Sequence, residues 1–513
     1  MQKIFLFIIL CVNTAFSQPT LEWAARYSLS SGNLYLLNAA IDNNENIYFT
    51  GYDDFNNILV KYNTTGTMLW SKSYPNARAY AIKVDNFGNI YLGGCNHSFN
   101  YGDFWVIKYN PEGNVVWENS FSNNGNPSND CCLDLIIDNA GIVYATGYTS
   151  LAGSFEDYCT VKYNSDGTRN WVKTFHYSID YFDLAKSITL DNNNNILVTG
   201  EVFDSNSTQN YCTIKYNANG ELIWYRTLSG FVYEAEKIIS VGQDIFVTGR
   251  AGSVIGTICY NSSGNQQWIQ YVQNGFYSDM VLDNSQSPVI TGQLYDSTLQ
   301  RISLLMLKYN NSGNLLWSAG FTSGSYSSGK SLSFDENDNL YVLGSGNFGY
   351  DNHLLTLKYS NTGVLLWQQQ YSVVSDSFYT PVKIHYKNNK IYTVANATWV
   401  DGLRREAIII KYSQTMGINT ISSETPSQFS LSQNYPNPFN PTTNFEFSIP
   451  QAEFVNLTIY DAVGRIVETL HNGELKSGIY KANWNASNFP SGVYFYRLSA
   501  GSFTGTKKMV LIK

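Results

Sequence analysis

The 513-residue sequence predicts an all-β protein: an eight-bladed β-propeller with four-stranded blades, followed by a small immunoglobulin-like β-sandwich. A Lys-Tyr phrase that runs through a turn to a Trp, as in KYNPEGNVVW (108–117), recurs along most of the chain. A second phrase, as in DNFGNIYLGG (85–94), keeps the same period. Aromatic residues make up 15% of the chain and charged residues only 14%. These features favour many short strands joined by turns over helices.

The chain begins with a segment that predicts export. Lys3 supplies a positive end, Ile4 to Val12 form an apolar run, and Ala15-Phe16-Ser17 offer a cleavage site before Gln18. This order of features is typical of a secretory signal peptide, and the apolar run is too short to span a bilayer. We therefore expect residues 1–17 to be a signal peptide and the mature protein not to be transmembrane.

The charge of the chain argues against two kinds of partner. The formal net charge is −8, the isoelectric point is near 5.2, and no run of Lys or Arg occurs. Nucleic acids and anionic membrane surfaces attract basic proteins, so neither is expected to bind this chain.

The repeat contains four strands. In the second copy we expect strand a to end in AYAIKVD (79–85), strand b to be NIYLGG (89–94), strand c FWVIKYN (104–110) and strand d NVVWENS (114–120). Each run is short, rich in Val, Ile, Tyr and Trp, and bounded by Asn and Gly, which tolerate the positive φ of tight turns. The Tyr of the phrase recurs every 44 residues (Tyr216 to Tyr260) to 54 residues (Tyr109 to Tyr163), a period that suits propeller blades.

The last repeat stops halfway. It has the Lys-Tyr phrase at Lys411 but no Trp, whereas LEWAARYS (21–28) has a Trp and no Lys-Tyr phrase before it. We expect strand 21–28 to be strand d of the last blade, which would close the ring and remove its open edge. One structural position is then occupied by eight of the eleven tryptophans: Trp23, Trp70, Trp117, Trp171, Trp224, Trp268, Trp317 and Trp367.

Residues 18–413 resemble bacterial β-propeller repeat families whose blades carry an Asp…Gly-Asn-Ile-Tyr-Val-Thr-Gly phrase. The resemblance implies the fold and says little of activity, because one fold serves many functions.

Six cysteines remain after the signal peptide: Cys95, Cys131, Cys132, Cys159, Cys212 and Cys259. Cys159 and Cys212 occupy a strand-c position where other copies place mainly apolar residues. Free Cys behaves as a small apolar residue, and equivalent strands of neighbouring blades rarely come within disulfide distance. Buried thiols are therefore favoured over disulfides.

A second module follows the repeats. Residues 414–427 are polar and without pattern, as in a linker, and residues 428–513 contain short alternating strands separated by Gly, Pro and Asn. The motifs NYPNPFNPTT, IYDAVGRIV, SGVYFYRL and KKMVLIK, in this order, resemble the C-terminal sorting domain of the type IX secretion system of Bacteroidetes and relatives.

The resemblance implies that the secretion machinery is a partner and that the protein reaches the cell surface or the medium through the periplasm and outer membrane. The positions that match the sorting motif are Asn434, Pro436, Asn437, Pro438, Gly492, Tyr494, Lys508 and Lys513. The Pro-Asn stretch could also cap the sandwich.

The sequence contains no recognisable catalytic constellation. No HExxH, GxSxG or P-loop motif occurs. The predicted propeller contains four histidines, and none of them has the spacing of metal ligands. The Lys of the repeated phrase is expected to be structural, because a residue repeated around a ring is not a unique base. No cofactor is expected.

The a–b turns leave a calcium hypothesis open. Asp42, Asn44 and Asn46 resemble the first half of a calcium loop, as do Asp191 and Asp335 with their Asn neighbours. The later bidentate Glu is missing, and Asp and Asn suit such turns without a metal. Turn chemistry is therefore favoured over calcium.

The loops divide between the two faces of the predicted ring. The a–b and c–d turns share one face and are short, whereas the d–a and b–c loops share the other face and vary in length. Variable loops on a rigid scaffold commonly bind ligands. The aromatic residues expected to form a ligand-binding face are Tyr80, Phe121, Tyr181, Phe182, Tyr233, Tyr277, Tyr326, Phe378 and Trp399. They could instead plug the channel or cover strand ends.

Three functions remain open. The favoured one is a secreted or surface-displayed binding protein, without catalytic activity, for a glycan or a protein. An alternative is a glycan-degrading enzyme that uses two loop carboxylates, which would have to converge at the channel mouth. The third is a structural or adhesive component of the envelope.

Overall fold

The computed structural model describes residues 19–30, 32–98, 101–122, 129–150, 155–178, 181–229, 234–348, 351–373, 376–399, 404–413, 419–422, 425–486 and 489–513. The expected signal peptide, residues 1–17, lies outside the described residues. Residues Trp23–Lys387 and Tyr392–Lys411 belong to one compact unit, and Tyr412–Lys513 form the bulk of a second. Each unit is described by itself.

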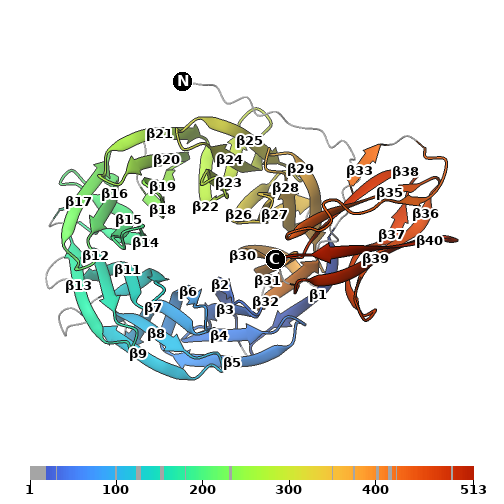
Figure 1. Ribbon diagram of the computed structural model, residues 1–513. Helices are drawn as coiled ribbons and strands as arrows, with labels where there is room; N and C mark the ends of the chain where they lie inside the picture. The colour runs from blue at the N-terminus through green and yellow to red at the C-terminus, as the bar shows by residue number, and fades with distance from the viewer. Residues whose placement is uncertain are drawn as a thin grey trace. The chain divides into compact units, whose positions relative to one another are not determined.

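The first unit is an eight-bladed propeller. Eight four-stranded sheets surround a common axis, with β2, β6, β10, β14, β18, β22, β26 and β30 innermost (Figure 1). In the first seven blades four consecutive strands form the sheet in chain order, as the repeat predicts.

The strands of the first four blades have these bounds. Blade 1 contains β2 (Tyr35–Ile41), β3 (Ile47–Tyr52), β4 (Asn56–Tyr62) and β5 (Met68–Pro75). Blade 2 contains β6 (Ala77–Val84), β7 (Ile90–Ser98), β8 (Tyr101–Tyr109) and β9 (Val115–Phe121). Blade 3 contains β10 (Cys131–Ile137), β11 (Val143–Ser150), β12 (Glu156–Tyr163) and β13 (Arg169–Phe175). Blade 4 contains β14 (Leu184–Leu190), β15 (Ile196–Phe203), β16 (Gln209–Tyr216) and β17 (Leu222–Leu228).

The other four blades follow. Blade 5 contains β18 (Glu234–Val241), β19 (Asp244–Ala251), β20 (Val254–Asn261) and β21 (Gln266–Gln273). Blade 6 contains β22 (Gly275–Leu282), β23 (Pro288–Asp296), β24 (Arg301–Tyr309) and β25 (Leu315–Phe321). Blade 7 contains β26 (Ser327–Phe334), β27 (Leu340–Phe348), β28 (Asp351–Tyr359) and β29 (Leu365–Tyr371). Blade 8 contains β30 (Asp376–Lys387), β31 (Lys390–Trp399), β32 (Arg405–Ser413) and β1 (Thr20–Tyr27).

The last blade is completed by the first strand of the chain. The sheet order is β1-β32-β31-β30, so β1 pairs with the strand that carries Lys411 (Figure 1). The expected ring closure is confirmed. β32 gains a partner along its outer edge, which would otherwise present unpaired main-chain groups.

In seven of the eight blades the repeated Trp joins its blade to the next. Its indole N–H donates to a main-chain oxygen in the following c–d turn: Trp23 to Thr64, Trp70 to Pro111, Trp117 to Ser165, Trp171 to Ala218, Trp224 to Ser262, Trp268 to Asn311 and Trp317 to Asn361. The packed Trp in turn requires a glycine in this turn, because Gly66 has a φ of +79° and a Cβ there would lie 2.7 Å from the Trp23 ring. The phrase Lys-Tyr…Gly…Trp is thus a joint between blades.

The repeated Lys has the structural role that the sequence predicts. Lys61 Nζ donates to Pro111 O at 2.9 Å, the same oxygen that Trp70 contacts. Lys215 Nζ donates to Ser262 O at 2.9 Å and forms an ion pair with Asp191 at 2.8 Å. The ammonium group thus links an a–b turn of its own blade to a turn of the next blade.

The cores lie between the blades. Phe49 and Val60 of blade 1, for example, pack in one cluster with Val394 and Ile409 of blade 8. β24 alternates its side chains toward two neighbouring cores, and its last seven residues are all buried. Burial of one such apolar side chain contributes about 1.5–3 kcal/mol, so stability is spread over the whole ring.

The cysteine prediction is wrong for one pair. Cys95 and Cys131 form a disulfide, with Cα atoms 4.6 Å apart, whereas Cys132, Cys159, Cys212 and Cys259 are buried thiols as expected. Cys95 lies on strand b of blade 2, and Cys131 on strand a of blade 3. The distance argument held for equivalent strands only, and these two strands are not equivalent.

The second unit consists of two four-stranded sheets. One has the order β33-β38-β35-β34 and the other β37-β36-β39-β40. The strands are β33 (Asn419–Ser422), β34 (Ser430–Leu431), β35 (Thr442–Ile449), β36 (Glu453–Asp461), β37 (Ile466–Leu475), β38 (Gly478–Asn485), β39 (Gly492–Ala500) and β40 (Phe503–Leu511). One core that includes Trp484, Tyr496 and Met509 lies between them.

The segment expected to be a linker contains a strand. Within residues 414–427, Asn419–Ser422 form β33, which pairs with β38 from Asn419 opposite Lys481. Pairing at a sheet edge is made by main-chain groups and does not require the alternating pattern that was absent here.

No helix in the described part of the chain is long and apolar enough to cross a membrane.

Candidate functional site

The tight-turn face of the propeller carries the Asp residues of the calcium hypothesis. Asp42 Oδ1 accepts hydrogen bonds from the N–H groups of Asn44 and Asn46, both at 2.8 Å. Its Oδ2 accepts from the Asn46 side chain at 2.7 Å and from Tyr48 Oη at 2.9 Å. Burial and the neighbouring Asp42 raise the pKa of Tyr48 far above its ordinary value, so this phenol remains a donor.

The same turn recurs around the ring. Asp85, Asp191 and Asp335 cap their turns in the same way. Lysines from strand c pair with three of the aspartates: Lys215 with Asp191, Lys308 with Asp283 and Lys358 with Asp335. Internal donors therefore occupy the carboxylate oxygens, and no group of three or more metal-ligating side chains occurs among the described residues.

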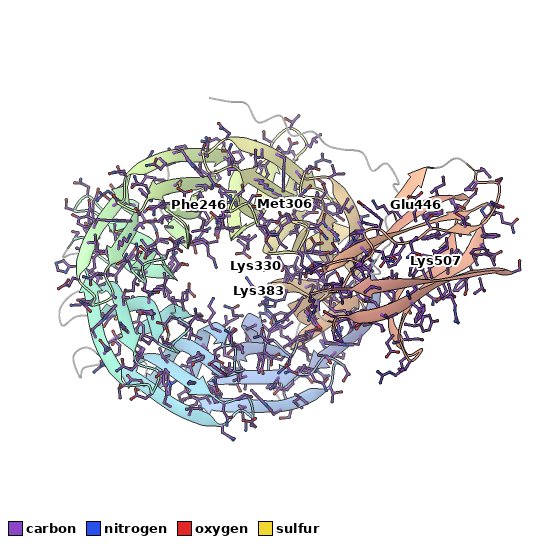
Figure 2. The ribbon with its side chains drawn as sticks, in the orientation of Figure 1. Phe246, Met306, Lys330, Lys383, Glu446 and Lys507 are labelled. Carbon is purple, nitrogen blue, oxygen red and sulfur yellow. A yellow bond between two sulfur atoms is a disulfide. The ribbon has the colours of Figure 1, made fainter. Side chains whose placement is uncertain are left out.

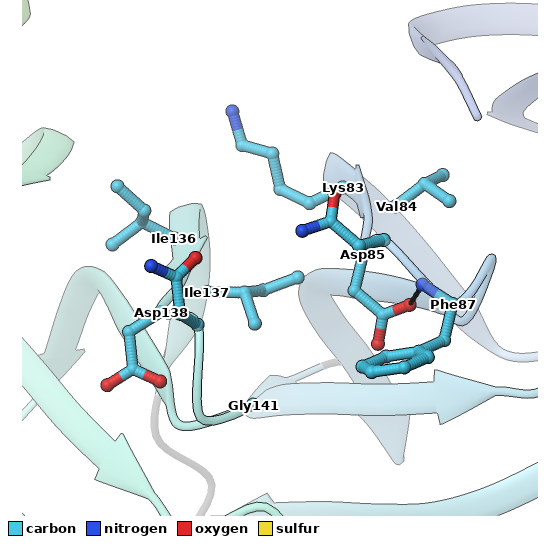
Figure 3. A pocket seen from close by; sticks show the side chains of 10 residues that line it. Lys83, Val84, Asp85, Phe87, Ile136, Ile137, Asp138 and Gly141 are labelled. Atoms are coloured by element: carbon cyan, nitrogen blue, oxygen red, sulfur yellow. Dashed lines mark hydrogen bonds between the residues drawn. The ribbon is translucent and has the colours of Figure 1, made fainter. Parts of the chain in front are cut away.

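A pocket of about 300 Å³ opens on this face between blades 2 and 3. Lys83, Phe87, Ile136 and Ile137 are among the residues that line it, and the Asp85 carboxylate accepts from the Phe87 N–H (Figure 3). The Lys83 side chain extends away from Phe87 in Figure 3. The lining carboxylate of Asp85 thus serves the turn rather than the pocket.

The inner strands place charged residues around the axis. Lys383 on blade 8 lies 3.5 Å from Asp279 on blade 6, and Lys330 and Lys383 lie on the inner side of the ring (Figure 2). Burial would raise the pKa of Asp279, but Lys383 and Lys237 hold it below its ordinary value. Burial and nearby lysines lower the pKa of His385 to about 4, so His385 is neutral at pH 7 and its Nε2 donates to Ala39 O.

Two aspartates on the inner strands, Asp134 and Asp279, hold neighbouring blades together. Asp134 accepts from the Ser187 hydroxyl at 3.1 Å and the Ile188 N–H at 3.2 Å of the next blade. Asp279 makes the same pair of contacts with Ser331 and Leu332. The charges at the axis are thus partly structural.

On the loop face, two of the predicted residues join an aromatic cluster. The cluster consists of Phe155, Tyr181, Phe182 and Phe203, from the loops and strand ends of blades 3 and 4, and we call it the blade 3–4 cluster. Phe182 packs edge-on against Phe203 with ring centroids 4.7 Å apart, and Phe155 lies 6.2 Å from Phe182. Phe155 is 52% exposed and Phe182 is 40% exposed, so the cluster presents apolar ring surface to solvent.

The ring of Tyr181 is held by a ring contact and by a hydrogen bond. Tyr181 stacks on Phe203 at 6.4 Å and accepts a hydrogen bond from Ser207 at 2.7 Å. The cluster therefore presents its exposed rings on a supported base.

Two carboxyl groups lie beneath the cluster. Burial raises the pKa of Asp183 to about 7 and that of Asp157 to about 6, and the two groups repel one another. Asp183 accepts from the N–H groups of Tyr177 at 2.6 Å and Phe203 at 3.1 Å. Asp157 is only 3% exposed and Asp183 is fully buried, so both side chains lie below the surface.

The other predicted aromatic residues are spread over the ring. Tyr80 lies on β6, where its main-chain oxygen accepts from Asn38, and Tyr277 lies on β22 and packs on a core. Phe121 stacks on Phe104 at 5.2 Å. Tyr326 accepts a main-chain hydrogen bond from Asn347.

Three predicted residues remain. Phe378 is exposed, Trp399 lies 5.2 Å from the Arg404 guanidinium, and Tyr233 lies outside the described residues. Of the eight predicted residues that the structure describes, only Tyr181 and Phe182 are brought together.

One group on the loop face was missed in the sequence. Tyr35, Tyr52, Arg78 and Arg405 stack on one another across three blades. The adjacent arginines at 404 and 405 were the only local signal.

The second unit holds the sorting-motif residues. Asn434 is buried: its N–H donates to Tyr496 Oη at 2.8 Å, and its side chain donates to Thr443 and Pro436. Asn437 accepts from the Val510 N–H at 3.0 Å, and Phe439 pairs with Leu511. The Pro-Asn stretch is therefore fastened to the final strand β40.

Of the remaining motif residues, Gly492 and Tyr494 lie on β39 and Lys508 lies on β40. Gly492 pairs with Leu511, and Tyr494 donates to Pro490 O at 2.7 Å. Pro436, Asn437, Pro438, Lys508 and Lys513 are exposed. Exposed motif residues thus surround a buried Asn that holds the turn in place.

This unit matches a family model described as the secretion system C-terminal sorting domain, over residues 433–513. Residues 433–513 are a type IX secretion sorting domain. The sorting domain directs export of the chain by type IX secretion to the cell surface or beyond, as the sequence resemblance implied. No curated protein matches the chain.

Solved structures similar to the chain include propellers of several kinds. The Dos1 propeller has a TM-score of 0.47 and 10% identity, covering 77% of this chain and 95% of that one. An ulvan lyase of polysaccharide lyase family PL25 has a TM-score of 0.42 and 11% identity, covering 76% and 97%. PorZ, a surface component of the type IX secretion system of Porphyromonas gingivalis, has a TM-score of 0.29 and 13% identity, covering 95% and 71%. With every TM-score below 0.5, the fold rests on the strand pairing described above.

Proposed function

We propose that the exported chain is a binding protein without catalytic activity, and that its loop face recognises a glycan or a protein through the blade 3–4 cluster. The exposed rings of Phe155 and Phe182 carry this proposal. Apolar rings held in water on a supported base commonly mark recognition surfaces. Ring faces stack on the apolar faces of sugars or on apolar side chains of a partner.

The burial of Asp157 and Asp183 argues against these two carboxyl groups as the catalytic pair of a hydrolase. A glycan-degrading enzyme needs two carboxyl groups that both touch the substrate. Burial, and to a smaller extent repulsion from Asp157, raises the pKa of Asp183, but both carboxyl groups are buried, and Asp183 is engaged by two main-chain donors.

Two parts of the proposal concern processing and fold. Residues 1–17 would act as the signal peptide that delivers the chain to the periplasm, before the sorting domain directs passage of the outer membrane. The sandwich of the sorting domain would be of the immunoglobulin-like type. N-terminal sequencing of the exported protein, expected to begin at Gln18, tests the first part.

We also propose that the Asp and Asn turns work without calcium. The oxygens of Asp42 are already occupied by four donors, and those of Asp191 also bind Lys215. A chelator should therefore leave the thermal midpoint unchanged, and a shift of several degrees reversed by Ca²⁺ would contradict this part.

The main test is a glycan and protein-ligand array with the chain from Gln18 to Lys513. We expect saturable binding that F155A/F182A abolishes. Phe87→Ala is the matched control, because Phe87 is 82% exposed on the opposite, tight-turn face. Equal loss with F87A, or unchanged binding by F155A/F182A, would contradict the assignment.

A further inference from the structure

Four side chains on the loop face form a continuous stack, which we call the Arg–Tyr ladder. The Arg405 guanidinium lies 4.7 Å from the ring of Tyr35, Tyr35 stacks on Tyr52 at 5.2 Å with 16° between the planes, and the Arg78 guanidinium lies 4.3 Å from Tyr52. Tyr35 and Tyr52 are directly opposed on β2 and β3 of blade 1. Arg405 comes from blade 8 and Arg78 from blade 2, so the ladder crosses three blades.

The ladder stands at the loop-face ends of its strands. Tyr35 and Arg405 begin β2 and β32, Tyr52 ends β3, and Arg78 is the second residue of β6. A guanidinium that stacks by its face keeps its N–H groups in its plane, pointing outward from the stack. Arg405 is exposed, and the other three side chains are half-buried.

The ladder's donors are not used within the described part of the chain. No ion pair or hydrogen bond joins the guanidinium groups of Arg78 and Arg405, or the hydroxyls of Tyr35 and Tyr52, to another described residue. Lys186, another cation on this face, is neutralised, because it contacts Glu201, Glu234 and Glu236 at 3.0–3.6 Å. Two stacked guanidinium groups without a carboxylate partner among the described residues offer their N–H donors to an anion from outside, as a local positive site in a chain whose net charge is −8.

The spacing of the charges indicates the kind of anion. The three steps of the stack place the two guanidinium groups at most about 14 Å apart, since each step is 4.3–5.2 Å. Because two phenol rings lie between the guanidinium groups along the stack, we expect each guanidinium to take its own anionic group. A polymer with repeated anionic groups supplies these, and hydroxyl groups between its charges would meet the two phenols.

We propose that the Arg–Tyr ladder binds an acidic polysaccharide through its carboxylate or sulfate groups. Arg78 and Arg405 each hold one anionic group by paired N–H···O bonds, and Tyr35 and Tyr52 exchange hydrogen bonds with the sugar hydroxyls between them. The ladder rests on the proposed function only in that both place recognition on the loop face. It uses none of the residues of the blade 3–4 cluster, so the two assignments can fail separately.

The test measures binding of the chain from Gln18 to Lys513 to polygalacturonate, dextran sulfate, neutral dextran and polyglutamate. We expect binding to polygalacturonate, to dextran sulfate or to both, decreasing as salt rises, and none to neutral dextran. R78Q/R405Q should weaken binding about tenfold or more per arginine lost. Polygalacturonate and dextran sulfate distinguish a carboxylate from a sulfate ester.

Two further variants control for folding and bulk charge. R78K/R405K keeps the charge but not the planar donors and should also bind more weakly, whereas R465Q/R497Q, which removes two arginines from the sorting domain, should bind normally. The proposal is overturned if R78Q/R405Q and R78K/R405K bind the polysaccharides as tightly as the wild type, or if R465Q/R497Q loses as much affinity as R78Q/R405Q. It is also overturned if polyglutamate binds as tightly as the acidic polysaccharides, or if neither polygalacturonate nor dextran sulfate binds. Loss with F155A/F182A alone would support the blade 3–4 cluster and contradict the ladder.

Discussion

Trp23 Nε1 and Lys411 Nζ donate to the same acceptor, the main-chain oxygen of Thr64, at 3.0 and 2.9 Å. The two residues stand at opposite ends of the propeller sequence. Trp70 and Lys61 share Pro111 O in the same way, although they belong to one continuous repeat. The joint at the ring closure is therefore built like the joints inside the repeats, with the strand supplied by the start of the chain.

The joint predicts a strict requirement for glycine at position 66. Gly66→Ala adds the cost of a positive φ and drives a Cβ into the Trp23 ring, so we expect a loss of about 2–4 kcal/mol and a lower thermal midpoint. Gly252 is the matched control, because its φ is +55° and a Cβ there would meet nothing within 4 Å. If G252A and G66A lower the midpoint equally, Trp23 does not pack on Gly66.

The two buried carboxyl groups predict effects of different size for the same substitution. Burial holds the pKa of Asp157 at about 6 when folded, above its ordinary value of 3.8. The folded state therefore holds more protons between pH 4 and pH 6, and stability falls as pH rises through this window. Asp157→Asn removes the buried charge and should stabilise the protein by about 1–3 kcal/mol at pH 8, with no gain at pH 4.

Asp183→Asn should stabilise the protein at pH 8 less than Asp157→Asn does, although burial raises the pKa of Asp183 further, to about 7. An amide offers one oxygen where Asp183 accepts from two main-chain N–H groups, so one donor loses its partner, and this cost of about 1–3 kcal/mol offsets the gain from removing the buried charge. Denaturant unfolding of both variants at pH 4 and pH 8 checks the pair. A larger gain at pH 8 for D183N than for D157N would mean that the two hydrogen bonds of Asp183 do not form.

The disulfide predicts a redox-dependent stability. Cys95 and Cys131 enclose 36 residues of sequence separation, and their link should contribute about 3–4 kcal/mol. C95S/C131S should therefore melt at a lower temperature than the wild type. A reductant should lower the midpoint of the wild type and leave that of the variant unchanged. A non-reducing peptide map without the Cys95–Cys131 peptide would show that the link is absent.

Removal of the sorting domain should stop export. A chain that ends at residue 427 keeps every strand of the propeller but lacks the family match at 433–513. In a bacterium with a type IX system we expect this chain to accumulate in the periplasm, as measured by cell fractionation. Its appearance at the cell surface would contradict the role of the domain.

Much of the fold could be predicted because the same strand and turn pattern recurs eight times along the chain. The position of Trp23 followed from counting tryptophans, and the role of Lys61 from its recurrence around the ring. The Cys95–Cys131 link could not be predicted in this way, because it joins strand b of one blade to strand a of the next. β33 was missed because its four residues pair only through the main chain.

The loop face was less predictable. Tyr181 and Phe182 adjoin in sequence, so their shared cluster followed from one loop, but Phe155 and Phe203 come from other loops. The Arg–Tyr ladder joins positions 35, 52, 78 and 405, and its last member becomes a neighbour only when the ring closes. Contacts that depend on loop paths or on closure leave no pattern in a single repeat.

Hydrogen exchange of β32 tests the closure of the ring most directly. We would compare the chain from Gln18 to Lys513 with one that begins at Leu29 and lacks β1. We expect slow exchange of the β32 amides that face β1 in the full chain and fast exchange of those amides in the shortened chain, with β24 of blade 6 equally protected in both. Equal protection of β32 in the two chains would contradict closure by the first strand.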